Sequence, residues 1–316
     1  MGRRGSRRGK AVDGLFLLDK PLGLSSNGAL QRVKRLFGAA KAGHTGSLDP
    51  LATGMLPICF GEATKFSQFM LDADKVYRTT AKLGVRTASG DTDSEIIAER
   101  DVPSFSVEQV EQALQTFKGE TEQVPSMFSA LKHQGQPLYK LAREGIEVER
   151  KARKIVISRI ELLASREAEL DIELHCSKGT YVRSLVDDLG ELLGCGAHVT
   201  ALRRLAVSGL AGQPMYTLEE LEKIATDGAG SPECEQNLLE LLLPVRTAVE
   251  GLPEVELTDL LAHYIKQGQP VFVPNTHVEG KVVLFNKEAN EEDGFLGIGE
   301  VLDDGRVAPR RLVKIG

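Results

Sequence analysis

The chain has 316 residues, of which 41% are hydrophobic and 27% are charged, and its formal net charge is −6 at pH 7. It is long enough to bury a sizeable core and has room for roughly two domains. No apolar run approaches the roughly 18 residues that cross a bilayer, and the basic N-terminus lacks the apolar core of a secretory signal, so we expect a cytoplasmic protein that crosses no membrane.

The first fifty residues are strongly basic. Residues 1–50 carry ten lysines and arginines against three aspartates, a local charge of +7, whereas acids gather in 219–250 and 288–304. This polarity predicts a basic face that binds an anionic partner such as a nucleic acid. The alternative is a solvated tail plus one charged helix face. We assign residues 1–10 to a basic, disordered tail.

A strand and a helix follow this tail. The segment GLFLLDKP, residues 14–21, predicts a short apolar strand that the proline stops. Ser25 or Ser26 then offers an N-cap for a helix that Gly38 ends. One face of this helix is apolar and is expected to pack on a core. Its residues are Leu30, Val33 and Phe37.

The segment GHTGSLDPLATGML, residues 43–56, is expected to form a shaped loop that is neither helix nor strand. Proline disfavours helical backbone at the residue before it, so Asp49, which precedes Pro50, should lie on an ordered turn. Three glycines permit tight turns or the close approach of another molecule. From these residues alone, Asp49 is either a functional acid or an acid that caps backbone N–H groups in a common Asp-Pro turn.

Three strands and one helix are expected in the middle of the chain. Residues 75–85 alternate and place Tyr77 on the same side as three smaller or apolar residues. A capping box of Ser106 and Gln109 begins a helix with a structural role. Two more alternating segments, 152–163 and 168–176, predict strands.

The segment SKGTYVRSLVDDLGELLG, residues 177–194, switches to the helical period. A strand, a turn at Gly179 and a helix therefore place Tyr181 and Arg183 at a helix N-terminus, where ligand groups are often presented. The helix dipole disfavours an arginine in a first turn, so we expect Arg183 to bind an anion. The alternative is a surface arginine in a local ion pair.

The last part of the chain differs in character. Residues 226–236 are polar, with glycines and a proline, and predict a surface loop. Beyond Pro253, one short helix and several short strands with close turns are typical of a small β-barrel-like domain. The chain ends in a basic group, which comprises Arg306, Arg310, Arg311 and Lys314.

The four cysteines argue against two kinds of structural site. They show no C-x-x-C spacing and no cluster with histidine, so neither a zinc site nor a disulfide framework is expected. We expect them to be reduced and mostly buried, and we expect no bound metal.

Six segments of the chain, in this order, resemble the tRNA pseudouridine synthases of the TruB type, which isomerise uridine 55 in the T arm of tRNA. They are residues 17–27, 43–65, 75–78, 125–145, 176–190 and 202–209. The resemblance implies an α+β pseudouridine synthase fold over 11–250, with a mixed, largely antiparallel central sheet flanked by helices. It implies a small PUA-like RNA-binding β domain over 251–316.

The resemblance also assigns catalytic roles. Asp49 falls on the aspartate that all pseudouridine synthases share, although Ser47 stands where relatives carry alanine. Arg183 matches the arginine that pairs with this aspartate and holds it ionised. Tyr77 matches the tyrosine that stacks on the target base and removes its C5 proton. The reaction moves no electrons to an acceptor, and so no cofactor is expected.

Further residues match positions that bind the RNA. Tyr181 and Leu202 line the base pocket, and His44 inserts where the flipped base was. Contacts to phosphate or to the active-site loop are implied for three basic residues, Lys20, Lys65 and Arg204. The expected partner is the T-arm stem-loop of tRNA, bound by a monomer with no obligatory protein partner, and the basic C-terminal group would grip the acceptor stem.

Two other classes of protein compete with this interpretation. An RNA-binding or tRNA-remodelling protein without catalysis could share the basic tail and the C-terminal domain, but it would not need Asp49, Tyr77 and Arg183 together. A glycosidase would need a second catalytic carboxylate, and no second acid stands in a comparable motif.

Overall fold

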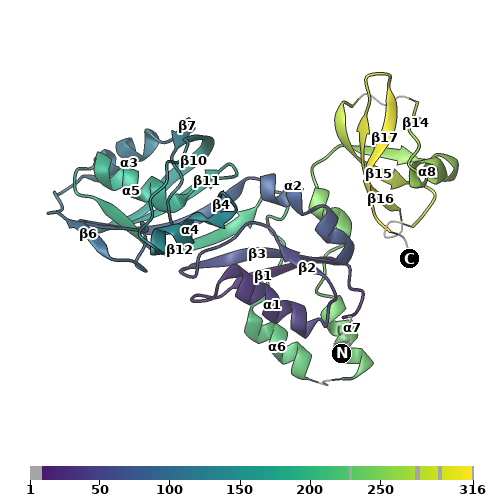
Figure 1. Ribbon diagram of the computed structural model, residues 1–316, viewed down its shortest axis with the longest axis horizontal. Helices are drawn as coiled ribbons and strands as arrows, with labels where there is room; N and C mark the ends of the chain where they lie inside the picture. Colours follow the sequence, from purple (N-terminus) through teal and green to yellow (C-terminus); the bar gives the residue numbers. More distant parts are fainter. Residues whose placement is uncertain (1–8, 228–229, 275–277, 291–293, 315–316) are drawn as a thin grey trace.

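The structure is a computed structural model that describes residues 9–227, 230–274, 278–290 and 294–314. Most of the predicted basic tail lies outside these residues. Figure 1 shows two main parts, a large sheet with helices around it and a smaller C-terminal β structure. Within the described ranges, no helix is long and apolar enough to cross a membrane.

The large sheet has eight strands in the order β1-β3-β12-β4-β11-β10-β7, with β2 paired to β3. The pairing of β12 with β3 is parallel and the other pairings are antiparallel. The predicted mixed, largely antiparallel sheet is therefore confirmed. Its strands are β1 (Gly14–Lys20), β2 (Ala42–His44), β3 (Ala52–Phe60), β4 (Lys75–Leu83), β7 (Gly119–Gln123), β10 (Arg153–Arg166), β11 (Glu169–Cys176) and β12 (Ala197–Val207).

Helices flank this sheet, and the predicted caps are present. Ser25 caps α1, because its Oγ accepts a hydrogen bond from Gly28 N at 3.1 Å. Ser106 and Gln109 form the capping box of α3. The helices are α1 (Ser26–Leu36), α2 (Ser67–Asp72), α3 (Val107–Gln115), α4 (Leu138–Arg143), α5 (Val182–Leu192), α6 (Leu218–Thr226) and α7 (Pro232–Leu239), with 3-10 turns η1 (Gly61–Lys65) and η2 (Val245–Val249).

The prediction of a loop over 43–56 is wrong at both ends. His44 belongs to β2 and residues from Ala52 onward belong to β3, so only residues 45–51, here called the Asp49 turn, connect the two strands. The glycines suggested turns, but one of them, Gly54, lies inside strand β3. A Cβ on Gly54 would lie 2.2 Å from the carbonyl oxygen of Arg204, and this close approach of β12 requires glycine.

The prediction of a surface loop over 226–236 is also wrong in its second half. Helix α7 begins at Pro232, and its N-cap is Ser231, whose Oγ accepts a hydrogen bond from Cys234 N at 3.1 Å. Ser-Pro is a favourable helix start, because proline at the first helical position loses no hydrogen bond. Burial of Cys234 and Leu238 stabilises this short helix. All four cysteines are free and buried, as predicted.

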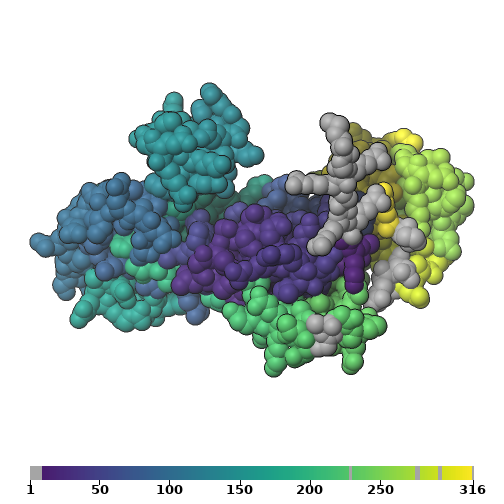
Figure 2. All heavy atoms as spheres, turned by 60° about the horizontal axis from the view of Figure 1, so that its bottom comes forward, coloured from purple at the N-terminus to yellow at the C-terminus, as the bar shows by residue number. Residues whose placement is uncertain are grey.

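Two small hairpins extend from the sheet. They are β5 (Val85–Thr87) with β6 (Ile96–Glu99), and β8 (Lys132–His133) with β9 (Gln136–Pro137). The second hairpin and α4 form a lobe with its own small core of Met127, Leu138 and Leu141. In Figure 2 this lobe, in teal, projects from the body of the molecule.

The C-terminal part is a five-stranded sheet in the order β13-β15-β16-β17-β14. It is a small curled β domain, consistent with the PUA-like module that was expected. Phe295 of this part meets Phe66 of the first part with ring centroids 5.4 Å apart, within a shared apolar cluster. Its elements are β13 (Glu254–Leu257), α8 (Asp259–Lys266), β14 (Val271–Phe272), β15 (Gly280–Asn286), β16 (Phe295–Val301) and β17 (Arg306–Leu312).

Candidate active site

Three neighbouring strands bring the predicted catalytic residues to one place. Strand β12 lies between β3 and β4. Its Leu202 is the register partner of Ala52, which follows the Asp49 turn, and its Arg204 is the register partner of Tyr77. The sheet order therefore gathers residues that lie up to about 150 positions apart along the sequence.

Helix α5 adds the arginine. Tyr181 is its N-cap and Arg183 lies in its first turn, as predicted. Arg183 Nη2 lies 3.0 Å from Asp49 Oδ2, and the arginine side chain is 5% exposed against 42% for the aspartate. The guanidinium is further fixed by hydrogen bonds to Ser89 O at 2.7 Å and Phe128 O at 3.0 Å. Arg183 is thus held rigidly and aims at the Asp49 carboxylate.

Two opposing effects set the ionisation of Asp49. Burial raises the pKa of the Asp49 carboxyl above its ordinary value, the charge of Arg183 lowers it, and Asp91 raises it again. Asp91 Oδ2 lies 3.4 Å from Arg183 Nη1, so the two carboxylates share one cation. Arg183 consequently favours the ionised form of the carboxyl, whereas burial and Asp91 favour the protonated form.

A cavity of about 390 Å³ opens beside this pair. Its volume lies in the range of small-molecule sites. Both polar and apolar residues line it. The predicted site residues among its lining are Asp49, Tyr77, Tyr181, Arg183, Leu202 and Arg204. Burial raises the pKa of Tyr77, so its phenol is uncharged at neutral pH and presents a neutral ring to the cavity.

Two predicted basic residues donate hydrogen bonds to backbone carbonyls of the Asp49 turn. Arg204 is 1% exposed and donates from Nε to Met55 O at 2.6 Å and from Nη2 to Gly46 O at 3.0 Å. Lys20 is 0% exposed and donates from Nζ to three backbone carbonyls, one of which, at 3.5 Å, belongs to Pro50. Burial lowers the pKa of Lys20 to about 8. Contacts to phosphate or to the active-site loop were predicted for Lys20 and Arg204. Their positions fit a contact to the loop.

The other two predicted binding residues lie apart from the cavity. His44 ends β2, next to the Asp49 turn, and burial lowers its pKa, so the ring is neutral at pH 7. Its Nδ1 has no hydrogen-bond partner among the described residues. Lys65 pairs with Glu62 at 2.5 Å and donates to Leu312 O at 2.9 Å, which places it at the junction with the C-terminal part.

Two residues that shape the site were not predicted from the sequence. Asp91 is the second acid on Arg183, and a polar segment with a glycine, SGDTDS, was its only signal. Gln123 accepts from Tyr181 N at 2.8 Å and donates to Tyr181 O at 3.0 Å, which fixes the start of α5. Nothing in the sequence around Gln123 points to this contact.

The sequence matches family models over most of its length. Residues 34–182 match the model described as "TruB family pseudouridylate synthase (N terminal domain)". Residues 183–250 match "tRNA pseudouridylate synthase B C-terminal domain", and residues 253–313 match "Pseudouridine synthase II TruB, C-terminal".

Three curated relatives share more than half of their residues with this chain, and each is named tRNA pseudouridine synthase B. The relative from Tolumonas auensis is 57% identical, over 100% of this chain and 97% of that protein. The relative from Yersinia enterocolitica is 55% identical, over 99% and 94%. The relative from Vibrio atlanticus is 54% identical, over 99% and 97%.

Solved structures share the fold. One is the "Crystal Structure of a Cbf5-Nop10-Gar1 Complex", with a TM-score of 0.72 and 24% identity over 95% of this chain and 84% of that chain. Another is the "Crystal structure of the archaeal box H/ACA sRNP Nop10-Cbf5 complex", with a TM-score of 0.70 and 22% identity over 96% and 86%. At these identities the likeness concerns the fold alone.

Proposed function

The chain belongs to the TruB family of tRNA pseudouridine synthases, and from that premise we propose that it isomerises uridine 55 in the T arm of tRNA after this nucleotide has swung out of the RNA. As a member of this family the protein is an isomerase that acts on tRNA. The alternative of an RNA-binding protein without catalysis is therefore set aside. Beyond this family activity, we propose the modified position, the flipping of the base and the residues that catalyse the reaction and bind the RNA.

The observation that carries this proposal is the Asp49–Arg183 ion pair at the wall of a cavity. The reaction breaks the bond between N1 and C1′ of the ribose, turns the base and joins its C5 to C1′. It needs an ionised oxygen that acts as nucleophile or base, which we assign to Asp49, and protection from water. Arg183 favours the ionised form of this oxygen, and Leu202 helps to exclude solvent.

Tyr77 and Tyr181 are assigned to the base. An uncharged Tyr77 ring can stack on a pyrimidine. Its oxygen is also the candidate to take the C5 proton at the end of the reaction, a step in which the phenol must first release its own proton. Tyr181 also lines this cavity. The hydrogen bonds between Gln123 and the backbone of Tyr181 keep this wall in place.

Extrusion of a base from a folded T loop costs a few kcal/mol in lost stacking and pairing. We assign His44 to the vacated place in the RNA, because a neutral imidazole can stack there. Stacking of a base on an aromatic ring contributes roughly 1–3 kcal/mol, which offsets much of the cost. The lowered pKa of His44 supports this role, since it keeps the ring uncharged.

Recognition of the T loop requires its shape rather than one base, because uridine recurs throughout RNA. We assign the lobe around α4 to the surface that recognises the T loop. We assign the module over 251–316 to contact with the acceptor stem. In this proposal the protein binds tRNA as a monomer, and its synthase domain spans residues 11–250. Arg311 Nη1 donates to Lys65 O at 2.6 Å, so Lys65 is assigned to the alignment of the two parts rather than to phosphate.

The position is tested with an unmodified T-arm stem-loop and with two further RNAs, one with cytidine in place of uridine 55 and one with its loop sequence scrambled but its uridines kept. Pseudouridine is mapped by chemical labelling and primer extension. We expect product at position 55 of the first RNA and none in the others. Product at another uridine, or equal product from the scrambled loop, would refute the proposed position.

Contact of the C-terminal module with RNA is tested at Arg310, which is exposed and paired with Glu300 at 2.6 Å. Deletion of the module is a poor test, because it would uncover Phe66. Arg310→Gln should raise the Kd for full-length tRNA a few-fold and reduce the slope of log Kd against log salt by about 1. Glu300→Gln, which frees the arginine, should shift Kd the other way. Equal Kd values for both variants and the wild type would exclude this contact.

A further inference from the structure

The Asp49 turn is held by its backbone on both sides of the aspartate. After Asp49, the carbonyl oxygen of Pro50 accepts a hydrogen bond from Gly23 N at 2.8 Å. Before Asp49, the contact to Leu48 comes from a single side chain, Ser26. The sequence predicted Ser26 only as one of two candidates for a helix cap.

The hydroxyl of Ser26 contacts both polar backbone groups of Leu48. Its Oγ lies 2.9 Å from Leu48 O, to which it donates, and 2.7 Å from Leu48 N, from which it accepts. Ser26 is 4% exposed and Leu48 is 6% exposed, so water cannot replace these bonds. One side chain thus satisfies both the backbone N–H and the backbone C=O of Leu48, as a neighbouring strand does for a residue in a sheet.

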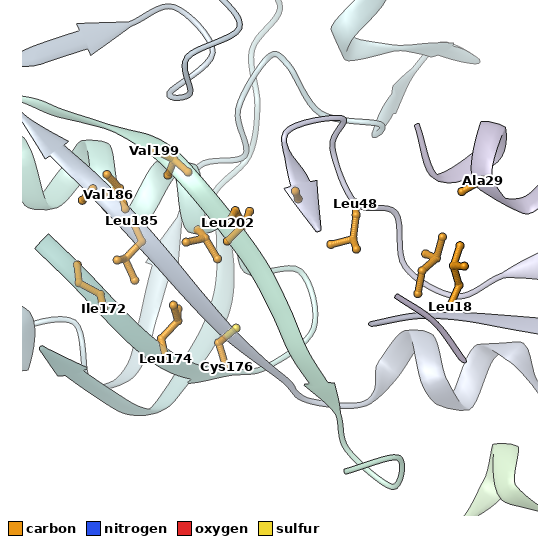
Figure 3. Packing of buried hydrophobic residues seen from close by; sticks show 14 of the residues in the cluster. Leu18, Ala29, Leu48, Ile172, Leu174, Cys176, Leu185, Val186, Val199 and Leu202 are labelled. Atoms are coloured by element: carbon orange, nitrogen blue, oxygen red, sulfur yellow. The ribbon is translucent and has the colours of Figure 1, made fainter. Parts of the chain in front are cut away.

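Helix α1 gives this contact a rigid base. Ala29 and Val33 of α1 are both 0% exposed and belong to the main core, as does the side chain of Leu48. Figure 3 shows Leu48 between the strand that carries Leu202 and the helix that carries Ala29. Because α1 is fixed in the core, its Ser26 also fixes the backbone of Leu48, the residue that precedes Asp49.

We propose that Ser26 is a positioning residue for the isomerisation, whose hydroxyl fixes Leu48 and so places the Asp49 carboxylate against Arg183. This inference rests on the proposed role of Asp49. A role in the helix does not explain the contact, because the cap of α1 is Ser25, which accepts from Gly28 N. Alanine is moreover a better helix former than serine, so Ser26→Ala does not weaken α1 through propensity.

The two adjacent serines provide a matched test. Ser26→Ala, Ser26→Cys and Ser25→Ala are compared with the wild type for the single-turnover rate constant with saturating enzyme, the Kd for a T-arm stem-loop, and the melting temperature. We expect Ser26→Ala to lose about 10- to 100-fold in the rate constant with an unchanged Kd, because a small misplacement of a reacting group has this effect. Ser26→Cys, which keeps the volume and a weaker hydrogen-bonding group, should lie in between. Ser25→Ala should lower the melting temperature and leave the rate constant unchanged.

The rate constant at saturating enzyme does not depend on the folded fraction, so a purely structural role of Ser26 would lower the melting temperature alone. That result would overturn the inference, as would equal rate losses in Ser25→Ala and Ser26→Ala. If Ser26→Ala does not fold, Ser26→Cys decides in the same way. A wild-type enzyme without activity would instead refute the proposed function, and the two failures are thereby distinguished.

Discussion

Asp49→Asn is expected to abolish the conversion of uridine while the protein becomes more stable at neutral pH. Loss of a catalytic nucleophile or base that acts with its partners lowers rates by about 10⁴-fold or more. Asparagine keeps the shape of the side chain, and Arg183 retains Asp91, 3.4 Å away, as a charge partner. The measurement is the single-turnover rate with a T-arm stem-loop, beside the Kd for the same RNA.

The gain in stability follows from the raised pKa of Asp49. The folded state holds this proton more tightly than the unfolded state, so the ionised carboxylate is a destabilising group at pH 7, and stability contributed by this site increases as the pH falls through the raised pKa. Asp49→Asn should therefore melt at a higher temperature than the wild type at pH 7, with the difference disappearing in acid. Asp19→Asn, whose parent side chain pairs with Arg203 away from the cavity, is the control and should stay active. Equal product from Asp49→Asn and the wild type would exclude Asp49 as the catalytic group.

Arg183→Met is expected to lower the rate at pH 7 by about 10²- to 10³-fold, the loss typical of removing one hydrogen-bond donor from a reaction centre. Its charge lowers the pKa of Asp49, against burial and Asp91, which raise it. Without the arginine, the pKa of Asp49 rises further, so the acid limb of the pH–rate profile should move to higher pH. Part of the lost rate should return in alkaline buffer, where the carboxylate is ionised again.

Arg183→Lys separates charge from geometry. It keeps the cation but loses the fork that reaches Ser89 O, Phe128 O and Asp49 together. We expect a smaller shift of the acid limb than in Arg183→Met, together with a loss of rate that high pH does not restore. An acid limb at the wild-type pH in Arg183→Met would contradict the pairing as the source of Asp49 ionisation.

Several elements could be predicted because their patterns are local. Alternation at period two identified β4, β10 and β11, and a serine cap, at Ser25 or Ser26, together with an apolar face identified α1. The motif around Asp49 identified the turn. The wrong predictions arose where one residue type occurs in two kinds of structure, glycine in turns and strands, and Ser-Pro in loops and at helix starts. Gly54 lies inside a strand because β12 passes close by, and Ser231-Pro232 starts a helix rather than a loop.

By itself, the sequence determined several of the elements, the family motifs and the presence of an acid on a turn, because hydrophobic period, caps and Asp-Pro geometry act over a few residues. Only the tertiary structure decided that Arg183 also binds Asp91, that Gln123 holds Tyr181, that Lys20 and Arg204 support the turn, and that Lys65 lies at the junction with the C-terminal part. These contacts join segments far apart in the chain. The order of strands in the sheet sets them, and that order depends on how whole faces bury one another.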